Sequence, residues 1–397
     1  MSLNQKRVVL LVDTLIEHNS HKMLANRELD EYLENEYKTY ISDIHYAIGC
    51  TNEECNDEMN KKIMQYVGNE KRTDDFFGLF IENIEKTLNV LRRNSKQILN
   101  ALRERRKGKI ISATRIAFDV FNMMADDLDD LGHDVMRERQ YYRFRQGIVS
   151  SRKEMFHIPI KKKQLIGEGR YNPAGYPCLY LSSQMEMGFL ESNKPNAYSV
   201  SIFKFADHFH VLDISDKTVV RICTDIQKIA QANYDMKKSV DDVLRVIRMH
   251  ILKVACMMEC EYQENSIKYH EEYFIPQMLT QWILEKDRFE GIEYEPKKRN
   301  SDINDGNNIV LFTHDYDEEG YDRKLRNGII LSSPKKIILS YRKKYRVYKR
   351  FIHKSIDRYC KKIQKMCVKR KDERIGMENI YRELPAIQCR AEDFAKI

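Results

Sequence analysis

The sequence predicts an α+β fold made of an N-terminal helical bundle, a mixed α+β domain and a basic C-terminal helix. Three observations support this prediction. Apolar residues recur at helical spacing through the first 135 residues, which contain no proline. From about residue 140, short apolar runs alternate with turns that contain glycine or proline. Residues 331–397 hold 20 Lys and Arg against 7 Asp and Glu, so the basic character belongs to this tail. We expect domains at residues 1–135, 140–332 and 333–397.

The N-terminal region is predicted to be a helical bundle, with a long helix from Asp74 to Arg106 whose apolar residues share one face. Cys50 and Cys55, with His45 nearby, offer too few ligands for structural zinc, which needs four. We therefore expect free thiols and no metal.

The second domain is predicted from short runs of strand and helix formers. The expected strands are Cys178–Leu181, Ser199–Phe205, Val211–Ile214, Gly291–Tyr294 and Asn308–Phe312, and the expected helices are Met185–Glu191, 239–259 and 273–286.

The stretch Gly167–Glu191 organises this domain, because it holds four of the chain's glycines and two of its prolines. Asn172-Pro173-Ala174-Gly175 predicts a turn, followed by the strand and helix given above. This corner would bring Arg170, Tyr180 and Glu191 close together. Arginine can hold a phosphate, tyrosine can stack on a ring, and glutamate can stabilise a developing cation.

Each of these residues also has a structural interpretation. Arg170 could fix the turn, Tyr180 could belong to the core, and Glu191 could cap a helix or form an ion pair. Glu186 is the alternative to Glu191.

The spacing of Arg170, Asn172, Gly175, Tyr180 and Glu191 resembles that of the RES domain family. The ordered motifs of this resemblance cover roughly residues 140–315 and include Tyr142-Arg143-Phe144-Arg145, Met155-Phe156-His157-Ile158-Pro159, Tyr273-Phe274-Ile275-Pro276-Gln277, Trp282, Gly291-Ile292-Glu293-Tyr294 and Asn308-Ile309-Val310-Leu311-Phe312. The resemblance implies the fold of ADP-ribosyltransferase toxins and cleavage of the nicotinamide–ribose bond of NAD.

The resemblance also implies roles for particular residues. Glu191 would stabilise the ribosyl cation, Tyr180 would orient the nicotinamide end, and Arg170 would hold the pyrophosphate. Arg143, Arg145 and Asn172 are further candidates for binding NAD.

The sequence departs from the family where a serine is expected shortly after Tyr294, because Pro296 stands there instead. Ser301 is the candidate replacement in binding NAD.

The N-terminal helices resemble the HEPN-type modules found beside RES domains. HEPN ribonucleases carry an Arg and a His four to six residues apart, and the pairs that fit are Arg152/His157, Arg245/His250 and Arg346/His353. In a chain so rich in arginine we interpret these matches as chance, and we favour a scaffolding or dimerisation role for the bundle.

The basic C-terminal helix has a tyrosine- and isoleucine-rich face and a Lys/Arg face. Residues 335–371 could simply cover the protein body, or engage nucleic acid, another anionic partner or a membrane surface.

No apolar run approaches the length of a transmembrane helix, and nine irregularly spaced cysteines suit a reducing cytoplasm. We therefore predict a cytoplasmic, NAD-consuming toxin or defence effector, with an antitoxin or other protein partner and a homodimer left open. The alternative is a non-catalytic protein of RES fold that binds an anionic partner through its tail.

Overall fold

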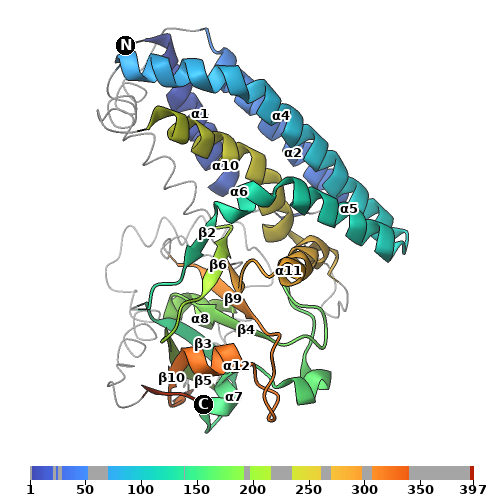
Figure 1. Cartoon of the computed structure of the whole chain (residues 1–397), viewed down its shortest axis with the longest axis vertical. Helices are drawn as coiled ribbons and strands as arrows, with labels where there is room; N and C mark the ends of the chain where they lie inside the picture. Colours follow the sequence, from blue (N-terminus) through green and yellow to red (C-terminus); the bar gives the residue numbers. More distant parts are fainter. Residues whose placement is uncertain are drawn as a thin grey trace, which may run out of the picture. The chain divides into compact units, whose positions relative to one another are not determined.

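The computed structural model describes residues 2–20, 24–25, 29–51, 70–137, 139–191, 197–215, 235–260, 270–296, 306–338 and 394–397. Helices dominate the first part of the chain, and a mixed arrangement of strands and helices follows (Figure 1). The predicted α+β class is thereby confirmed. Among the described helices, none combines the length and apolar character needed to cross a lipid bilayer.

The chain forms two compact units that interleave along the sequence. Unit 1 contains residues 1–134, 167–176 and 210–297, and unit 2 contains residues 135–166, 177–209 and 298–397.

Unit 1 is mainly helical. Its helices are α1 (Leu3–Ser20), α2 (Leu29–Gly49), α4 (Glu70–Arg106), α5 (Ile110–Met123), α6 (Ala125–Asp129), α10 (Met236–Met257), the 3-10 helix η2 (Glu271–Tyr273) and α11 (Phe274–Lys286). The long α4 packs against α1, α2, α5 and α10. Its buried residues, among them Leu88, Leu91 and Ile98, form the apolar face that the sequence predicts. The helix α10 therefore belongs to the bundle, although it lies far from α4 in the sequence.

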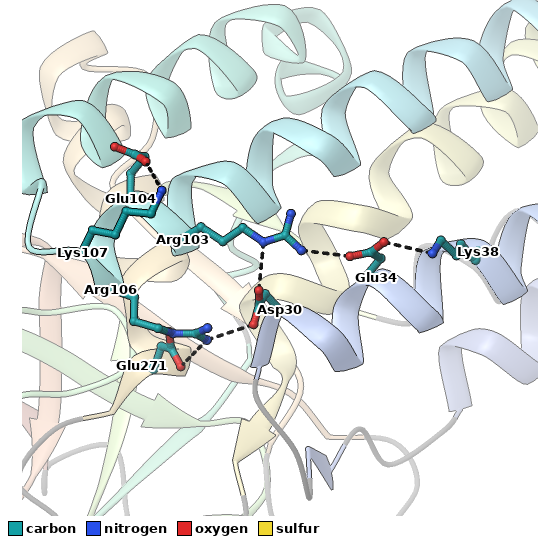
Figure 2. A network of polar contacts seen from close by, with 8 residues as sticks. All are labelled: Asp30, Glu34, Lys38, Arg103, Glu104, Arg106, Lys107 and Glu271. Carbon is teal, nitrogen blue, oxygen red and sulfur yellow. Dashed lines mark hydrogen bonds and ion pairs between the residues drawn. The ribbon is translucent and has the colours of Figure 1, made fainter.

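A network of charges joins three elements of unit 1 (Figure 2). The buried carboxylate of Asp30, at the start of α2, accepts hydrogen bonds from Arg103 at 2.9 Å and from Arg106 at 3.0 Å. Arg106 also binds Glu271 of η2, at 3.0 Å, and Arg103 binds Glu34 at 2.9 Å. Burial alone would raise the pKa of Asp30, but the two arginines outweigh it and lower that pKa. The network therefore fixes the C-terminal end of α4 against α2 and η2.

Unit 1 also contains short strands. β6 (His210–Asp213) pairs antiparallel with β2 (Gly132–Asp134) and parallel with β8 (Gly291–Tyr294), and β1 (Leu24–Ala25) pairs parallel with β7 (Glu259–Cys260).

Unit 2 is built on an antiparallel sheet. Its strands are β3 (Tyr141–Gln146), β4 (Cys178–Ser182), β5 (Ala197–Phe205), β9 (Asn308–Phe312), β10 (Ile329–Ser332), β11 (Lys335–Ile338) and β12 (Phe394–Ala395). The order is β12-β10-β5-β3-β4-β9, and β11 also pairs with β5. The helices are α7 (Arg152–Met155), the 3-10 helix η1 (Ile160–Leu165), α8 (Met185–Glu191) and α12 (Arg323–Gly328).

The C-terminal prediction needs one correction. Residues 335–338, the start of the segment predicted to be a basic helix, form strand β11 on β5. Ile337 and Ile338 are β-branched and pair there with Tyr198 and Ala197. Residues 339–371 of the predicted helix lie outside the described residues.

Candidate functional site

The turn predicted for Asn172–Gly175 forms in unit 1 one residue later, over Pro173–Tyr176. Gly175 has a φ of 86°, in the left-handed region that glycine adopts without strain. The Tyr176 amide donates to the Pro173 carbonyl at 3.2 Å and so closes the turn.

Side chains on both sides of this turn hold it in unit 1. The Asn172 side-chain amide donates to the carbonyls of Gly167 and Pro173, both at 3.1 Å. The Gln277 amide of α11 donates to the Gly169 carbonyl at 2.9 Å. The buried Asn172, predicted to bind NAD, is therefore engaged in shaping its own loop.

Arg170, the predicted pyrophosphate ligand, is buried at the end of α10. Its Nη1 donates to the Cys256 carbonyl, and its Nη2 donates to the Met258 carbonyl at 2.9 Å. Its guanidinium carbon lies 5.6 Å from the centre of the Tyr273 ring. The last carbonyls of a helix lack partners within the helix, and a basic side chain can supply them. This geometry favours the structural interpretation of Arg170.

Arg143 and Arg145 lie on β3 in unit 2, two residues apart and so on one face of the strand. Arg145 Nη2 donates to the Phe156 carbonyl at 2.9 Å. Arg143 is paired across the sheet with Ser201 of β5. The Arg143 Nη1 and Ser201 Oγ atoms are both buried without a hydrogen-bond partner among the described residues. A buried polar atom of this kind requires an explanation, and an anionic ligand would supply one for Arg143.

The electrostatics of Arg143 are unusual for an arginine. Burial lowers its pKa, and the neighbouring charge of Arg145 lowers it further. Ionised Cys178 and Tyr180 of β4 would act in the opposite direction. β3 and β4 share one register pair, Tyr142 with Ser182, so Arg143 lies just past the point where the two strands are paired. The charge of Arg143 therefore lies where β3 and β4 are neighbours but are not joined by a continuous ladder of backbone hydrogen bonds.

Tyr180, the predicted nicotinamide-orienting residue, is half-buried in β4 and pairs across the sheet with Val310 of β9. The prediction that Cys178–Leu181 forms a strand is correct, with β4 one residue longer. A half-buried ring can stack on a ligand or complete the core, so both interpretations of Tyr180 stay open.

Glu191, the predicted catalytic carboxylate, is the last residue of α8. Its Oε2 accepts a hydrogen bond from the side-chain amide of Asn308, at 2.7 Å. Asn308 is the buried first residue of β9 and stands opposite Ser182 of β4. Helix α8 covers the predicted residues, 185–191, and packs on β3 and β4. Glu191 is therefore held against the end of the strand pair β4–β9.

Gly188 allows this close approach of helix and sheet. A Cβ atom at Gly188 would lie 2.7 Å from the ring of Phe144 in β3, which is too short for a real contact. A larger residue at this position would push α8 away and move Glu191 from Asn308.

Three polar residues near the predicted site were missed by the sequence analysis. They are Ser182, Ser201 and Asn308, whose Oγ, Oγ and Oδ1 atoms are buried without a hydrogen-bond partner among the described residues. Ser201 could have been identified from the sequence, because it stands between apolar residues in a strand that is buried on both faces. Asn308 was recognised only as the start of a strand.

The other predicted site residues differ in whether the structure describes them and in the unit to which they belong. Ser301, the candidate replacement for the family serine, lies outside the described residues, whereas Pro296 is buried. The rival carboxylate Glu186 is in α8, but its side chain is outside the described part. Arg170 and Asn172 belong to unit 1, whereas Arg143, Arg145, Tyr180 and Glu191 belong to unit 2.

Arg245 and His157, two residues of the Arg and His pairs whose spacing fits HEPN ribonucleases, make contacts within the fold. Arg245 of α10 binds Asp242 at 2.7 Å and Asp130 at 2.6 Å. His157 Nδ1 donates to the Ile158 carbonyl at 3.0 Å, and its Nε2 accepts from the Asp322 amide at 3.0 Å. Helix α10, which carries Arg245 and His250, packs in the helical unit. The pair Arg346/His353 lies outside the described residues.

Comparison with known proteins yields one informative similarity. The chain is 29% identical over 157 residues to a protein of Bacillus subtilis (strain 168) named "Putative toxin YopC". The aligned region is 38% of this chain and 34% of the relative, so the chain spans about a third of the relative's length. No protein-family model matches the chain, and no solved structure matches it significantly. The similarity is therefore to a protein whose name describes a toxin, over part of both chains.

Proposed function

We propose that this protein is a toxin that consumes NAD by cleaving its nicotinamide–ribose bond. The observation that carries the proposal is the arrangement in unit 2. The carboxylate Glu191 is anchored to Asn308, and the cation Arg143 has a buried Nη1 without a partner among the described residues. Both belong to elements that pack around β4, which also carries Tyr180. The partial similarity to a protein named as a toxin supports the same class.

Each residue would have a distinct task in this reaction. The nicotinamide leaves with the bonding electron pair, and positive charge develops on the ribose ring. The Glu191 carboxylate would stabilise that charge, while the 2.7 Å hydrogen bond from Asn308 keeps it oriented. Arg143 would bind the pyrophosphate, and Tyr180 would orient the nicotinamide end. Water, phosphate or a macromolecule would then attack the ribosyl carbon, and these three acceptors remain open.

The proposal assigns the pyrophosphate to Arg143 rather than to Arg170. Both terminal nitrogens of Arg170 already donate to backbone carbonyls. Releasing them for a ligand would leave carbonyls at the end of α10 without their donor, at a cost of about 1–3 kcal/mol for each buried group.

The test compares NAD loss by the purified chain and two glutamate variants, with and without added phosphate. Glu191→Gln keeps the size of the side chain but removes its charge, so we expect turnover to fall by about 10²–10³-fold. Glu318→Gln is the matched control, because Glu318 is an exposed glutamate in the same unit. It should leave turnover unchanged. A Glu191→Gln variant with wild-type specific activity would overturn the proposal, as would a wild-type chain that leaves NAD intact.

The same pair of variants tests the biological part of the proposal. A toxin of this kind would act in the cytoplasm and would need an antitoxin or another protein partner to restrain it. Expression of the wild-type chain should arrest growth and lower cellular NAD, and Glu191→Gln should abolish both effects. Growth arrest by Glu191→Gln at equal expression would point to a mechanism other than NAD cleavage.

A further inference from the structure

Three potential metal ligands meet inside the helical bundle of unit 1, and none of them belongs to the proposed NAD site. They are His18 of α1, Glu36 of α2 and His250 of α10, and their ligand atoms all lie within 4.8 Å of one another. The three helices belong to the same bundle (Figure 1). Each helix thus contributes one side chain to a common point.

The distances between these atoms suit a shared metal ion. Glu36 Oε1 is 3.0 Å from His18 Nδ1 and 3.6 Å from His250 Nε2. Zinc binds histidine nitrogen and carboxylate oxygen at about 2.0–2.2 Å in tetrahedral geometry, which separates neighbouring ligand atoms by roughly 3.3–3.5 Å. Two of the three separations are thus close to those around a bound ion, and the third, between His18 and His250, is at most 4.8 Å.

The second ring nitrogen of His18 has the partner that metal-binding histidines usually have. His18 Nε2 lies 2.9 Å from Asp43 Oδ2, on the ring edge away from Glu36. A carboxylate in this position fixes the tautomer of a ligating histidine and makes its metal-binding nitrogen more basic. Asp43 therefore fits as an outer-shell residue.

The surroundings of His250 are not explained by hydrogen bonds alone. Its side chain is fully buried, and neither ring nitrogen has a hydrogen-bond partner among the described residues. Its ring stacks on Tyr40, with ring centres 3.7 Å apart, which fixes its orientation.

The hydrogen bonds of the cluster account for His18 but not for His250. His18 Nδ1 is 3.0 Å from Glu36 Oε1, and His18 Nε2 is 2.9 Å from Asp43 Oδ2. His250 Nδ1 is buried without a partner among the described residues, and His250 Nε2 is 3.6 Å from Glu36 Oε1, beyond ordinary hydrogen-bond length.

We propose that His18, Glu36 and His250 bind one divalent transition-metal ion of the zinc class, with Asp43 as the outer-shell acceptor. Two histidines and one carboxylate leave a fourth position for water or another ligand. No metal was expected from the sequence, because these ligands do not form a closely spaced motif but come from three helices distant in sequence. The proposal is independent of the NAD chemistry of unit 2.

The test measures zinc binding by the full chain after treatment with a chelator, by calorimetry and by a metal-dependent rise in melting temperature. Wild-type protein should bind one equivalent. Asp43→Asn changes a half-exposed residue and should weaken binding about 10–100-fold. Glu36→Gln should weaken it more than Asp43→Asn, because a ligand atom loses its charge. His45→Gln is the control, since His45 is a partly exposed histidine on α2, the helix that carries Glu36 and Asp43, and is paired with Glu85 at 3.2 Å. This control should bind zinc like the wild type.

Cobalt provides a second measurement that does not depend on every variant folding. Cobalt bound to wild-type protein should give the visible absorption of a tetrahedral site containing nitrogen ligands, and zinc should displace it. Absence of zinc binding by the wild type would overturn the proposal. Equal zinc affinity of wild-type, Asp43→Asn and Glu36→Gln proteins would also overturn it, because the ion would then bind elsewhere.

Discussion

Arg170 and Arg143 are both arginines of the predicted NAD site, yet their surroundings differ. In unit 1, Arg170 donates through both terminal nitrogens to carbonyls at the end of α10 and lies beside the ring of Tyr273. In unit 2, Arg143 has a buried Nη1 without a partner among the described residues, and burial lowers its pKa. Both arginines have one buried nitrogen without a partner among the described residues, Nε in Arg170 and Nη1 in Arg143, but only Arg170 has both terminal nitrogens engaged by the fold.

This difference teaches that the role of an arginine in a recognisable motif depends on which hydrogen-bond acceptors surround its guanidinium. Local sequence identifies the turn that presents Arg170, but the carbonyls of Cys256 and Met258 come from a distant helix.

The largest effect is expected for Arg170→Met, which keeps the side-chain length and removes the donors. Two hydrogen bonds from a charged group contribute about 1.5–3 kcal/mol each, so the free energy of unfolding should fall by about 3–5 kcal/mol. Urea denaturation measures this value, and Arg93→Met, at an exposed position of α4, should change it by less than about 0.5 kcal/mol. Unchanged stability combined with weaker NAD binding would restore Arg170 as a pyrophosphate ligand.

The second prediction concerns His157, which is buried in unit 2 and influenced by the charge of Arg143. Burial lowers the pKa of His157 from 6.5 to about 4. Between these values the unfolded chain binds more protons than the folded one, so stability is complete above pH 6.5 and falls as the pH drops toward 4. The full loss is about 3 kcal/mol.

The pH dependence of His157 is checked by urea unfolding at several pH values. His157→Gln, which lacks a titrating group but can accept the hydrogen bond from Asp322, should flatten the slope in this window. His208→Gln, at an exposed histidine of the same unit, should retain the wild-type slope. Identical slopes for all three proteins would show that His157 is not buried in its neutral form.

A third prediction addresses Arg143 directly. Arg143→Met should lower NAD affinity by about 10–100-fold, because the pyrophosphate loses a charged donor, while stability stays the same or rises. Calorimetric titration of NAD measures the affinity, and Arg323→Met, at an exposed arginine of unit 2, serves as the control. Wild-type affinity in Arg143→Met would remove this residue from the proposed site.

The smallest effect is expected in the charge network of Figure 2, where the groups, like Arg170, are engaged by the fold. Asp30→Asn should lower the free energy of unfolding by about 1 kcal/mol, because Arg103 and Arg106 remain partly exposed to screening water. Glu34→Gln removes a more exposed partner of Arg103 and should lower the free energy of unfolding by only about 0.3 kcal/mol. Equal effects of the two variants would mean that the burial of Asp30 does not increase the contribution of its ion pairs to the free energy of unfolding.

Much of the local structure was predictable from the sequence. The strands Gly291–Tyr294 and Asn308–Phe312 and the helix Met185–Glu191 have the predicted bounds. Short apolar runs flanked by turn residues, and an amphipathic pattern, depend only on nearby residues. The segment after Pro334 was misjudged because its first residues pair with β5, which is far away in the sequence.

The surroundings of the site residues were not predictable in this way. The bond between Asn308 and Glu191 joins residues that are distant in the chain, as does the contact of Arg170 with the end of α10. An amphipathic pattern shows that α10 must be covered, but not that α4 covers it. The same holds for the His18, Glu36 and His250 cluster, in which each ligand lies on a different helix.

The interleaving of the two units sets the order in which a newly made chain can fold. Helices α1, α2 and α4 emerge from the ribosome before α10, the helix that packs on α4. About 150 residues separate the end of α4 from the end of α10, and translation at about 5–20 residues per second needs roughly 8–30 s for them. During this interval β3, β4 and β5 have already been synthesised, while the apolar face of α4 still lacks one of its covers. In a nascent chain, the part of this face that α10 covers therefore stays uncovered until α10 has been synthesised.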